Sequence, residues 1–273
     1  MVVQSPEIAV VVPTFRRPTL VVEAVRSALS QDGVSVEVLV ADDSPEGSAR
    51  PAIEGLNDPR VTFQHRTVFT DSRPAVVRND AVRETRAPVV HFLDDDDRVA
   101  PGAYRAVLDA LAAHPDRGVV FGGVEPFGDD PAAVKREQGF FTTARRRARL
   151  FQRFDSRCAL IANELYVSPT LFVNSACFIR REHILALGGY DPDLEVMEDV
   201  EFFTRAIRRF GFIYLDRVVA EYRTGHPSLM NKKTDAQRVD AAYLRIYTRY
   251  RSNYGQLELR ALQLLAKGVI RWF

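Results

Sequence analysis

Apolar and polar residues follow two different periods along this chain. Short runs rich in apolar and β-branched residues, at 8–12, 36–40, 61–64, 88–90 and 118–121, are typical of strands in a buried sheet. Between these runs, apolar residues recur at helical spacing in residues 19–29, 74–86 and 102–113, and a shorter helix is expected near 46–56. This alternation predicts an α/β fold with a doubly wound, mostly parallel central sheet flanked by helices.

The regular alternation stops at about residue 121. Residues 122–169 show no clear period and contain the basic run 145–149, which is either a solvated helix face or loop, or a lid that attracts an anionic group. Order resumes with a strand at 176–179, helices at 181–187 and about 200–210, and strands at 212–215 and 218–222. The tail, from residue 234 onward, predicts two helices.

Composition narrows the class of protein. A chain of 273 residues can bury a substantial core, and its formal net charge of +1 gives nucleic acid no electrostatic footprint. Cys158 and Cys177 lack metal-ligand spacing and fit a reducing cytoplasm. No apolar run approaches the roughly 20 residues of a membrane helix. We therefore expect a cytoplasmic protein, and leave open whether the tail contacts a membrane surface peripherally or forms a homodimer.

Four consecutive acids, Asp94 to Asp97, follow the strand at 88–90. Two like charges about 4 Å apart repel by roughly 4 kcal/mol at an effective dielectric constant of about 20, so a positive counterpart is expected. Asp42 and Asp43 end the strand at 36–40. Because ligands bind beyond the carboxyl ends of parallel strands, these acids predict a site for a divalent cation that carries phosphate oxygens. A solvated acidic loop is the alternative.

Other uses of four consecutive acids fit less well. An EF-hand loop starting at Asp94 needs glycine at its sixth position and glutamate at its twelfth, where this chain has Val99 and Arg105. A two-metal nuclease needs further ligands and a basic surface, and the sequence indicates neither. The remaining interpretation is a metal clamp on a nucleotide diphosphate, with a separate carboxylate that deprotonates an acceptor hydroxyl.

Several short motifs follow one another in a fixed order along the chain. They are Val12-Pro13-Thr14-Phe15-Arg16-Arg17, Val40-Ala41-Asp42-Asp43-Ser44, Arg78-Asn79, Phe92-Leu93-Asp94-Asp95-Asp96-Asp97, Gly188-Gly189-Tyr190-Asp191 and Glu198-Asp199. In this order and spacing they resemble glycosyltransferase family 2, the inverting enzymes of GT-A fold. The resemblance spans roughly residues 8–228.

The resemblance implies a fold, a reaction and a set of residues. The fold is GT-A, with a Rossmann-like, mostly parallel sheet flanked by helices and here a helical C-terminal tail. The reaction is metal-dependent, inverting transfer of a sugar to a hydroxyl acceptor, with Mn²⁺ or Mg²⁺ as cofactor and a UDP-sugar favoured over dTDP- and GDP-sugars as donor. The implied residues are Pro13, Thr14, Phe15, Arg16, Asp42, Asp43, Arg78, Asp94 and Asp95 for the donor, Asp94, Asp96 and His226 for the metal, and Asp199 as base beside Glu198.

Simpler roles remain open for three of these residues. Asp199 would also be favoured by the helix dipole at the start of a helix, and His226 is compatible with a structural role. For Arg78, the alternative is a scaffolding pair with Asp42 or Asp43. The activity has two alternatives as well, a nucleotidyltransferase of related fold and a non-catalytic module that binds nucleotide sugars.

The resemblance also divides the chain. Residues 1–228 form the glycosyltransferase domain, with a nucleotide-binding part at 1–121 and an acceptor-binding part at 122–228, and residues 229–273 form a helical extension. Processive members carry Gln-x-x-Arg-Trp, whereas the tail has Gly268 in the first place of that motif. We therefore expect a single transfer.

Overall fold

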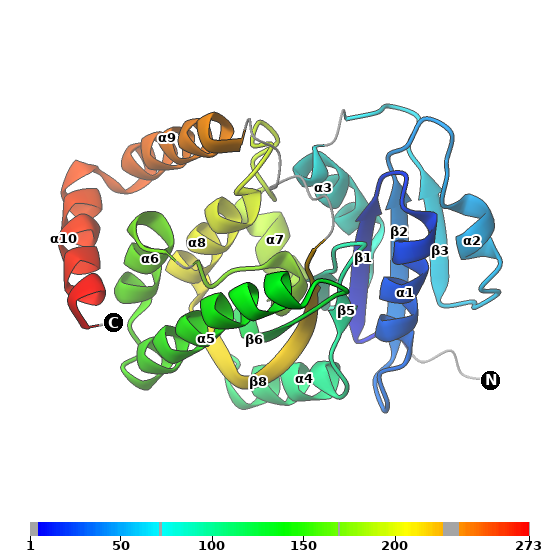
Figure 1. Ribbon diagram of the computed structural model, residues 1–273, viewed down its shortest axis with the longest axis horizontal. Coiled ribbons are helices and arrows are strands. Elements are labelled where there is room, and N and C mark those ends of the chain that lie inside the picture. Colours follow the sequence, from blue (N-terminus) through cyan, green and yellow to red (C-terminus); the bar gives the residue numbers. More distant parts are fainter. Residues whose placement is uncertain (1–4, 71–72, 169, 226–234, 273) are drawn as a thin grey trace.

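The central feature of the computed structural model is one eight-stranded sheet with helices on both faces (Figure 1). The structure describes residues 5–70, 73–168, 170–225 and 235–272. The strands are β1 (Ile8–Thr14), β2 (Val36–Asp42), β3 (Val61–His65), β4 (Val89–Phe92), β5 (Arg98–Val99), β6 (Val119–Phe127), β7 (Cys177–Arg180) and β8 (Phe212–Arg223).

The helices cover the sheet and build the C-terminal end of the molecule. The α-helices are α1 (Pro18–Leu29), α2 (Arg50–Glu54), α3 (Pro74–Glu84), α4 (Ala103–Ala113), α5 (Pro131–Arg153), α6 (Arg157–Tyr166), α7 (Arg181–Leu187), α8 (Glu198–Phe210), α9 (Asp235–Tyr254) and α10 (Gln256–Trp272), and a 3₁₀ turn, η1, spans Asn174–Ala176.

The sheet has the order β3-β2-β1-β4-β7-β6-β8-β5. Strands β3, β2, β1 and β4 are parallel, as the alternation of strands and helices predicted. Strand β7 then lies antiparallel between β4 and β6, and β8 runs parallel to β6. The α/β class with a largely parallel sheet is therefore confirmed, but β6 is not the direct neighbour of β4.

Two parts of the sequence-based prediction are wrong. Residues 122–169 are not irregular, because β6 continues to Phe127 and two helices, α5 and α6, follow it. Arginines and other polar residues cover most of α5, and small alanines such as Ala144 and Ala148 form much of its buried side, so the helical period is weak in the sequence. The two strands predicted at 212–215 and 218–222 are one bent strand, β8, whose register shifts opposite Gly122 and Gly123.

The core lies on both sides of the sheet. Along β1, Ile8, Val10 and Val12 belong to the cluster beneath α1 and α4, while Ala9 and Val11 belong to the cluster beneath α3 and α8. All five side chains are fully buried. This two-sided burial explains why the run 8–12 is continuously apolar.

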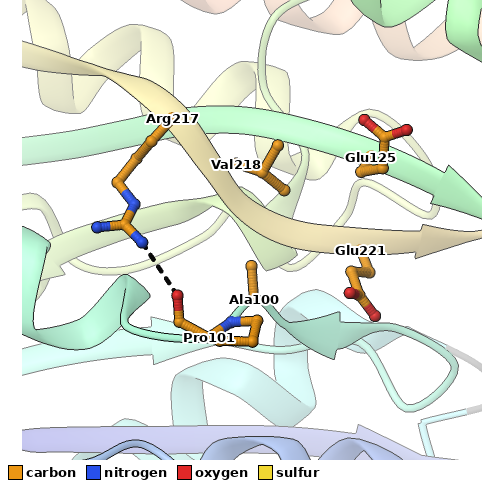
Figure 2. Close-up of a pocket in the computed structure, with 6 residues that line it drawn as sticks. All are labelled: Ala100, Pro101, Glu125, Arg217, Val218 and Glu221. Carbon is orange, nitrogen blue, oxygen red and sulfur yellow. Dashed lines mark hydrogen bonds between the residues drawn. The ribbon is translucent and has the colours of Figure 1, made fainter.

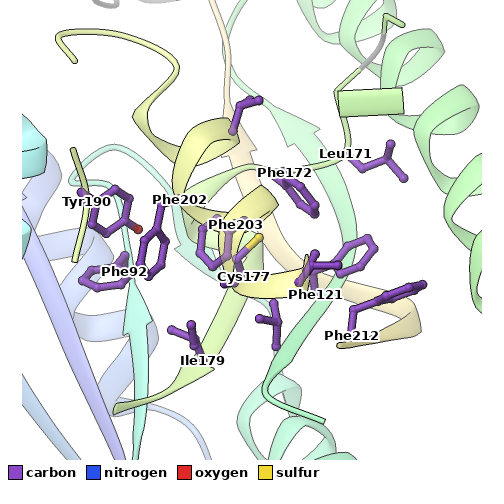
Figure 3. Packing of buried hydrophobic residues seen from close by; sticks show 14 of the residues in the cluster. Phe92, Phe121, Leu171, Phe172, Cys177, Ile179, Tyr190, Phe202, Phe203 and Phe212 are labelled. Carbon is purple, nitrogen blue, oxygen red and sulfur yellow. The ribbon is translucent and has the colours of Figure 1, made fainter. Parts of the chain in front are cut away.

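Helix α8 is anchored by adjacent aromatic residues (Figure 3). Phe202 stacks on Tyr190 with ring centroids 4.2 Å apart and meets the edge of Phe92, at the end of β4, at 6.4 Å. Phe203 packs against Phe172 at 5.8 Å. These contacts fix the first turn of α8 beside the end of β4, where the predicted site lies.

The C-terminal helices lie at the end of the molecule opposite β3 and α2 (Figure 1). Helix α10 packs against α6, and Arg208 of α8 pairs with Glu258 of α10 at 2.9 Å. Among the helices in the described ranges, none is long and apolar enough to cross a membrane.

Candidate active site

The second and third acids after β4, Asp95 and Asp96, lie beside the end of β1. Thr14 Oγ1, at the last residue of β1, donates to Asp95 Oδ2 at 2.7 Å. Arg17 Nη1, just before α1, donates to Asp95 Oδ1 at 2.9 Å and to Asp96 Oδ2 at 2.8 Å. Asp95 is 6% exposed, so it mainly ties the ends of two strands together, whereas Asp96 retains more contact with solvent.

The acidic tetrad, Asp94 to Asp97, holds more negative charge than its neighbours neutralise. Burial and the neighbouring Asp96 raise the pKa of Asp95 to about 6, although Arg17 opposes the rise. Burial and the charge of Asp94 also raise the pKa of Asp96. The pKa of Asp97 lies well above its usual range for the same reasons, burial first and the charges of Asp96 and Asp94 second. This excess of negative charge favours a cation at the tetrad.

Asp97 joins the tetrad to the end of β8. Its Oδ1 accepts a hydrogen bond from the backbone N–H of Arg223 at 2.9 Å, and Arg223 Nε donates to the carbonyl of Asp96 at 2.8 Å. The segment before residue 226 is therefore adjacent to the tetrad. His226, the third predicted metal ligand, lies outside the described residues.

Arg78 connects the tetrad to the start of α8. Its Nη2 donates to Asp94 Oδ1 at 2.6 Å and its Nη1 donates to Glu198 Oε1 at 2.7 Å. The residue is 3% exposed and its guanidinium lies 5.6 Å from the centre of the Tyr190 ring. The charges of Asp94 and Glu198 raise its pKa against the effect of burial, so the guanidinium stays protonated. The suggested pairing with Asp42 or Asp43 is therefore wrong.

The first turn of α8 presents Asp199 to the site. Met197, immediately before the helix, has φ +60°, a conformation that is unusual for a residue with a side chain. Asp199 is half-buried, and its Oδ1 accepts a hydrogen bond from the backbone N–H of Val200 at 2.8 Å. Burial raises the pKa of Asp199 well above its usual range, and the adjacent Glu198 carboxylate adds to the rise. Such a carboxylate accepts a proton more readily than an ordinary aspartate.

The 3₁₀ turn η1 contacts both Glu198 at the start of α8 and Asp94 of the tetrad. The sequence did not predict this turn. Asn174 Nδ2 donates to Glu198 Oε1 at 3.4 Å, while its Oδ1 accepts from the Tyr190 hydroxyl at 2.8 Å. Ser175 Oγ accepts from the backbone N–H of Asp94 at 3.1 Å. A short polar turn has no periodic pattern, so only its position beside β4 shows its role.

The acids at the end of β2 are occupied by neighbouring loops. Asp42 is fully buried and accepts from the Ser44 N–H at 2.8 Å, the Ser44 hydroxyl at 2.6 Å and the Ala49 N–H at 2.9 Å. Asp42 therefore stabilises the loop before α2, and none of its atoms is exposed to contact a bound nucleotide sugar. Asp43 is 3% exposed and accepts from Arg66 Nε at 3.2 Å and the Thr70 hydroxyl at 2.7 Å.

The residues after β1 form an exposed rim near these acids. Pro13 lies in β1 opposite Ala41 of β2. Phe15 is 37% exposed, and the Arg16 guanidinium lies 5.3 Å from its ring centre. Arg16 has φ +55° and pairs with Glu46 at 2.9 Å. An aromatic ring and a guanidinium on this edge suit a planar base or an anionic group.

The described side chains fit a metal ion only if another molecule completes its coordination. In the ranges that the structure describes, no three histidine, cysteine or acidic side chains are grouped to hold an ion. Asp94 and Asp96 supply carboxylate oxygens in a region of excess negative charge. This donor set fits Mg²⁺ or Mn²⁺, because such ions commonly bind one or two carboxylates and complete their coordination with phosphate and water.

A hollow of about 510 Å³ lies beside β5 and β8 (Figure 2). It is lined by Glu125, Arg217, Glu221 and residues near the start of α4, and Arg217 Nη2 donates to the carbonyl of Pro101 at 3.0 Å. None of the predicted site residues lines this hollow. The carboxylates at the strand ends, and not the hollow, therefore define the candidate site.

Comparison with solved structures identifies the class of fold. Pyrobaculum calidifontis mannosyltransferase PcManGT, solved with GDP-Man and Mn²⁺, matches with a TM-score of 0.62 and 20% identity over 90% of this chain and 64% of that one. S. aureus TarS 1-349, solved with UDP-GlcNAc, matches with a TM-score of 0.60 and 15% identity over 95% of this chain and 79% of that one. The fold is that of the GT-A glycosyltransferases.

The family follows from the sequence match. The family model described as Glycosyl transferase family 2 matches residues 9–184, and this chain belongs to that family. This is the family that the motifs predicted.

Two curated relatives match over a shorter stretch. The putative colanic acid biosynthesis glycosyl transferase WcaA of Escherichia coli is 31% identical over 106 residues, 38% of this chain and 37% of the relative. The GalNAc(5)-diNAcBac-PP-undecaprenol beta-1,3-glucosyltransferase of Campylobacter jejuni is 29% identical over 105 residues, 38% of this chain and 34% of the relative. The chain thus matches about a third of the length of these relatives.

Proposed function

We propose that this glycosyltransferase moves one sugar from a nucleotide-sugar donor to a hydroxyl acceptor, with inversion at the anomeric carbon and with a divalent metal. The Arg78 bridge carries the proposal. One buried guanidinium contacts Asp94 of the tetrad at 2.6 Å and Glu198, next to Asp199, at 2.7 Å. The donor side and the base side of the reaction therefore lie on either side of one side chain, which suits an in-line displacement.

The tetrad forms the diphosphate side of the proposed site. Asp94 and Asp96 would hold Mn²⁺ or Mg²⁺, joined by His226 as the family resemblance implies. The metal supplies charge neutralisation for the departing nucleotide diphosphate. Arg17 holds Asp95 and Asp96 in place at 2.9 and 2.8 Å.

The nucleotide would lie along the ends of β1 and β2. We assign its contacts to Thr14, Phe15, Arg16 and Asp43. The Asp43 N–H donates to the Thr14 carbonyl at 3.0 Å, and Phe15 and Arg16 follow Thr14 at the exposed rim. Pro13 and Asp42 shape this edge from within the sheet and the β2 loop. TarS was solved with UDP-GlcNAc and PcManGT with GDP-Man, so the preference for a UDP-sugar rests on the sequence resemblance.

Asp199 acts as the general base in this proposal. Its raised pKa suits the removal of a proton from an attacking hydroxyl, and that proton is transferred to the Asp199 carboxylate. Glu198 remains bound to Arg78 and Asn174, so it orients the first turn of α8. Turnover should therefore fall as the pH drops and Asp199 becomes protonated.

We divide the chain into the parts that the family resemblance implied. Residues 1–121 would bind the nucleotide, residues 122–228 the acceptor, and residues 229–273 form an extension. Gly268 replaces the glutamine of the processive motif, which supports a single transfer. The two free cysteines suit work in the reducing cytoplasm.

A donor screen tests the proposal. Purified protein is incubated with UDP-, dTDP- and GDP-sugars, with Mn²⁺, with Mg²⁺ or with chelator, and products are separated by chromatography. We expect metal-dependent release of the nucleoside diphosphate, fastest from a UDP-sugar. Release of pyrophosphate would indicate nucleotidyl transfer, and binding without turnover in the presence of acceptors would indicate a binding module.

A further inference from the structure

Helix α10 has a second apolar face that the core does not use. Leu257, Leu264 and Leu265 are 81%, 67% and 40% exposed, and Ala261 between them is also exposed. The spacing of these four residues, which we call the outer stripe, places them on one side of an α-helix. An exposed apolar face of this kind is typical of a contact surface.

The opposite face of the same helix already packs against the protein. Leu259, Leu262, Ala266 and Val269 are buried in the core cluster, and α10 lies against α6. Folding therefore accounts for only one of the two apolar faces of α10, and the outer stripe has no role in the described core.

The charges beside the outer stripe are basic. Arg260 and Lys267 are exposed, and each stands three residues after a leucine of the stripe. The single acid in the described part of α10, Glu258, pairs with Arg208 at 2.9 Å and accepts from the Tyr250 hydroxyl at 2.8 Å. An apolar stripe flanked by cations complements the surface of an anionic bilayer, with leucines among the acyl chains and cations at the headgroups.

We propose that the outer face of α10 docks on an anionic membrane surface. A second copy of the chain fits this face less well. The stripe from Leu257 to Leu265 is only about 12 Å long at 1.5 Å per residue, too short to bury roughly 800 Å² on each partner. A two-fold contact through so small a patch would also bring Arg260 and Lys267 close to their own copies.

The docking helix is firmly connected to the catalytic part of the enzyme. Glu258 of α10 binds Arg208 of α8, the helix that starts at Glu198. Arg245 of α9 binds Asp191 at 2.8 Å, in the loop before α8. A bilayer bound to α10 would therefore hold α8 in a defined orientation. The docking inference rests on α10 alone and does not depend on the proposed donor or base.

Vesicle flotation tests the proposal. The full chain is mixed with vesicles of phosphatidylcholine alone or of phosphatidylcholine with phosphatidylglycerol. We expect binding to the anionic vesicles only, and weaker binding as salt increases. Replacing Arg260 and Lys267 together by alanine should weaken binding roughly 25-fold, at about five-fold per charge.

The leucines and a matched control complete the test. Leu257→Gln with Leu264→Gln should abolish flotation, while Leu185→Gln, which changes a 48% exposed leucine on α7, should leave it unchanged. Thermal unfolding of each variant checks that the fold is intact. Failure of the wild-type chain to float overturns the proposal, as does flotation that survives the leucine changes. A concentration-dependent dimer in sedimentation that the same changes abolish would assign the face to a second copy.

Discussion

Replacing Arg78 by methionine is expected to destabilise the protein strongly. Methionine keeps much of the length of the side chain but removes the charge and both hydrogen bonds, to Asp94 and Glu198. Glu198 is 8% exposed, so its carboxylate would remain buried without its cation. Removing one partner of a buried ion pair typically costs about 3–5 kcal/mol.

The exposure of Asp94 places the expected loss at the lower end of that range. The Asp94 side chain is 32% exposed, so water recovers part of its solvation when Arg78 is removed. We therefore expect a loss of about 3 kcal/mol in the free energy of unfolding, or a fall of about 6–12 °C in melting temperature. Urea and thermal unfolding, followed by circular dichroism, measure the two quantities.

Two further variants decide whether the bridge is responsible. Arg83→Met removes an arginine from the same helix that is 69% exposed and pairs with Asp80, so we expect a loss below about 0.5 kcal/mol. Adding Glu198→Gln to Arg78→Met removes the unpaired charge and should recover part of the lost stability. If Arg78→Met costs no more than Arg83→Met, the bridge does not hold the start of α8 and the reasoning is refuted.

Three other changes probe the core, a buried acid and the metal. Burial raises the pKa of Glu164 to about 7, above its unfolded value of about 4.5, so the wild type loses stability as pH rises through this window. The free energy of unfolding of Glu164→Gln, relative to that of the wild type, should therefore rise by on the order of 2 kcal/mol between pH 5 and pH 8. Urea unfolding at several pH values measures this difference, and a difference that does not change with pH would contradict the raised pKa of Glu164. Phe202→Ala should lower the free energy of unfolding by about 3–5 kcal/mol, because the ring is fully buried. The control Phe154→Ala, which changes a 67% exposed ring, should lower it by less than about 0.5 kcal/mol. Equal losses in the two variants would refute the anchoring of α8. Asp96→Ala should reduce metal-dependent donor affinity about ten-fold or more in calorimetry, and unchanged affinity would exclude Asp96 as a ligand.

Local sequence features predicted the parallel half of the fold. The run 8–12 is apolar throughout because β1 is buried on both faces, and the tetrad follows β4 directly. The insertion of β7 between β4 and β6 could not be predicted, because strand pairing across such distances depends on tertiary packing. Helix α5 was missed because arginines and small alanines hide its helical period.

The sequence predicts residues for the site but not the contacts among them. The acids at the strand ends were visible in the sequence because each follows an apolar run. The partners of Arg78 were not, since Glu198 lies 120 positions away and Asn174 belongs to a turn without a pattern. Asp42 was expected at the donor, but its oxygens accept from the loop that follows β2.

The most direct test of the account compares donor binding with turnover in Asp199→Asn. This change keeps the size of the side chain and removes its ability to accept a proton. With the preferred donor and metal, calorimetry should give the wild-type donor affinity, while transfer should fall at least about 100-fold, the usual contribution of a general base. Asp193→Asn, which changes a 61% exposed acid in the loop before α8, serves as the control and should keep full turnover. Wild-type turnover in Asp199→Asn would contradict the assignment of the base at the start of α8.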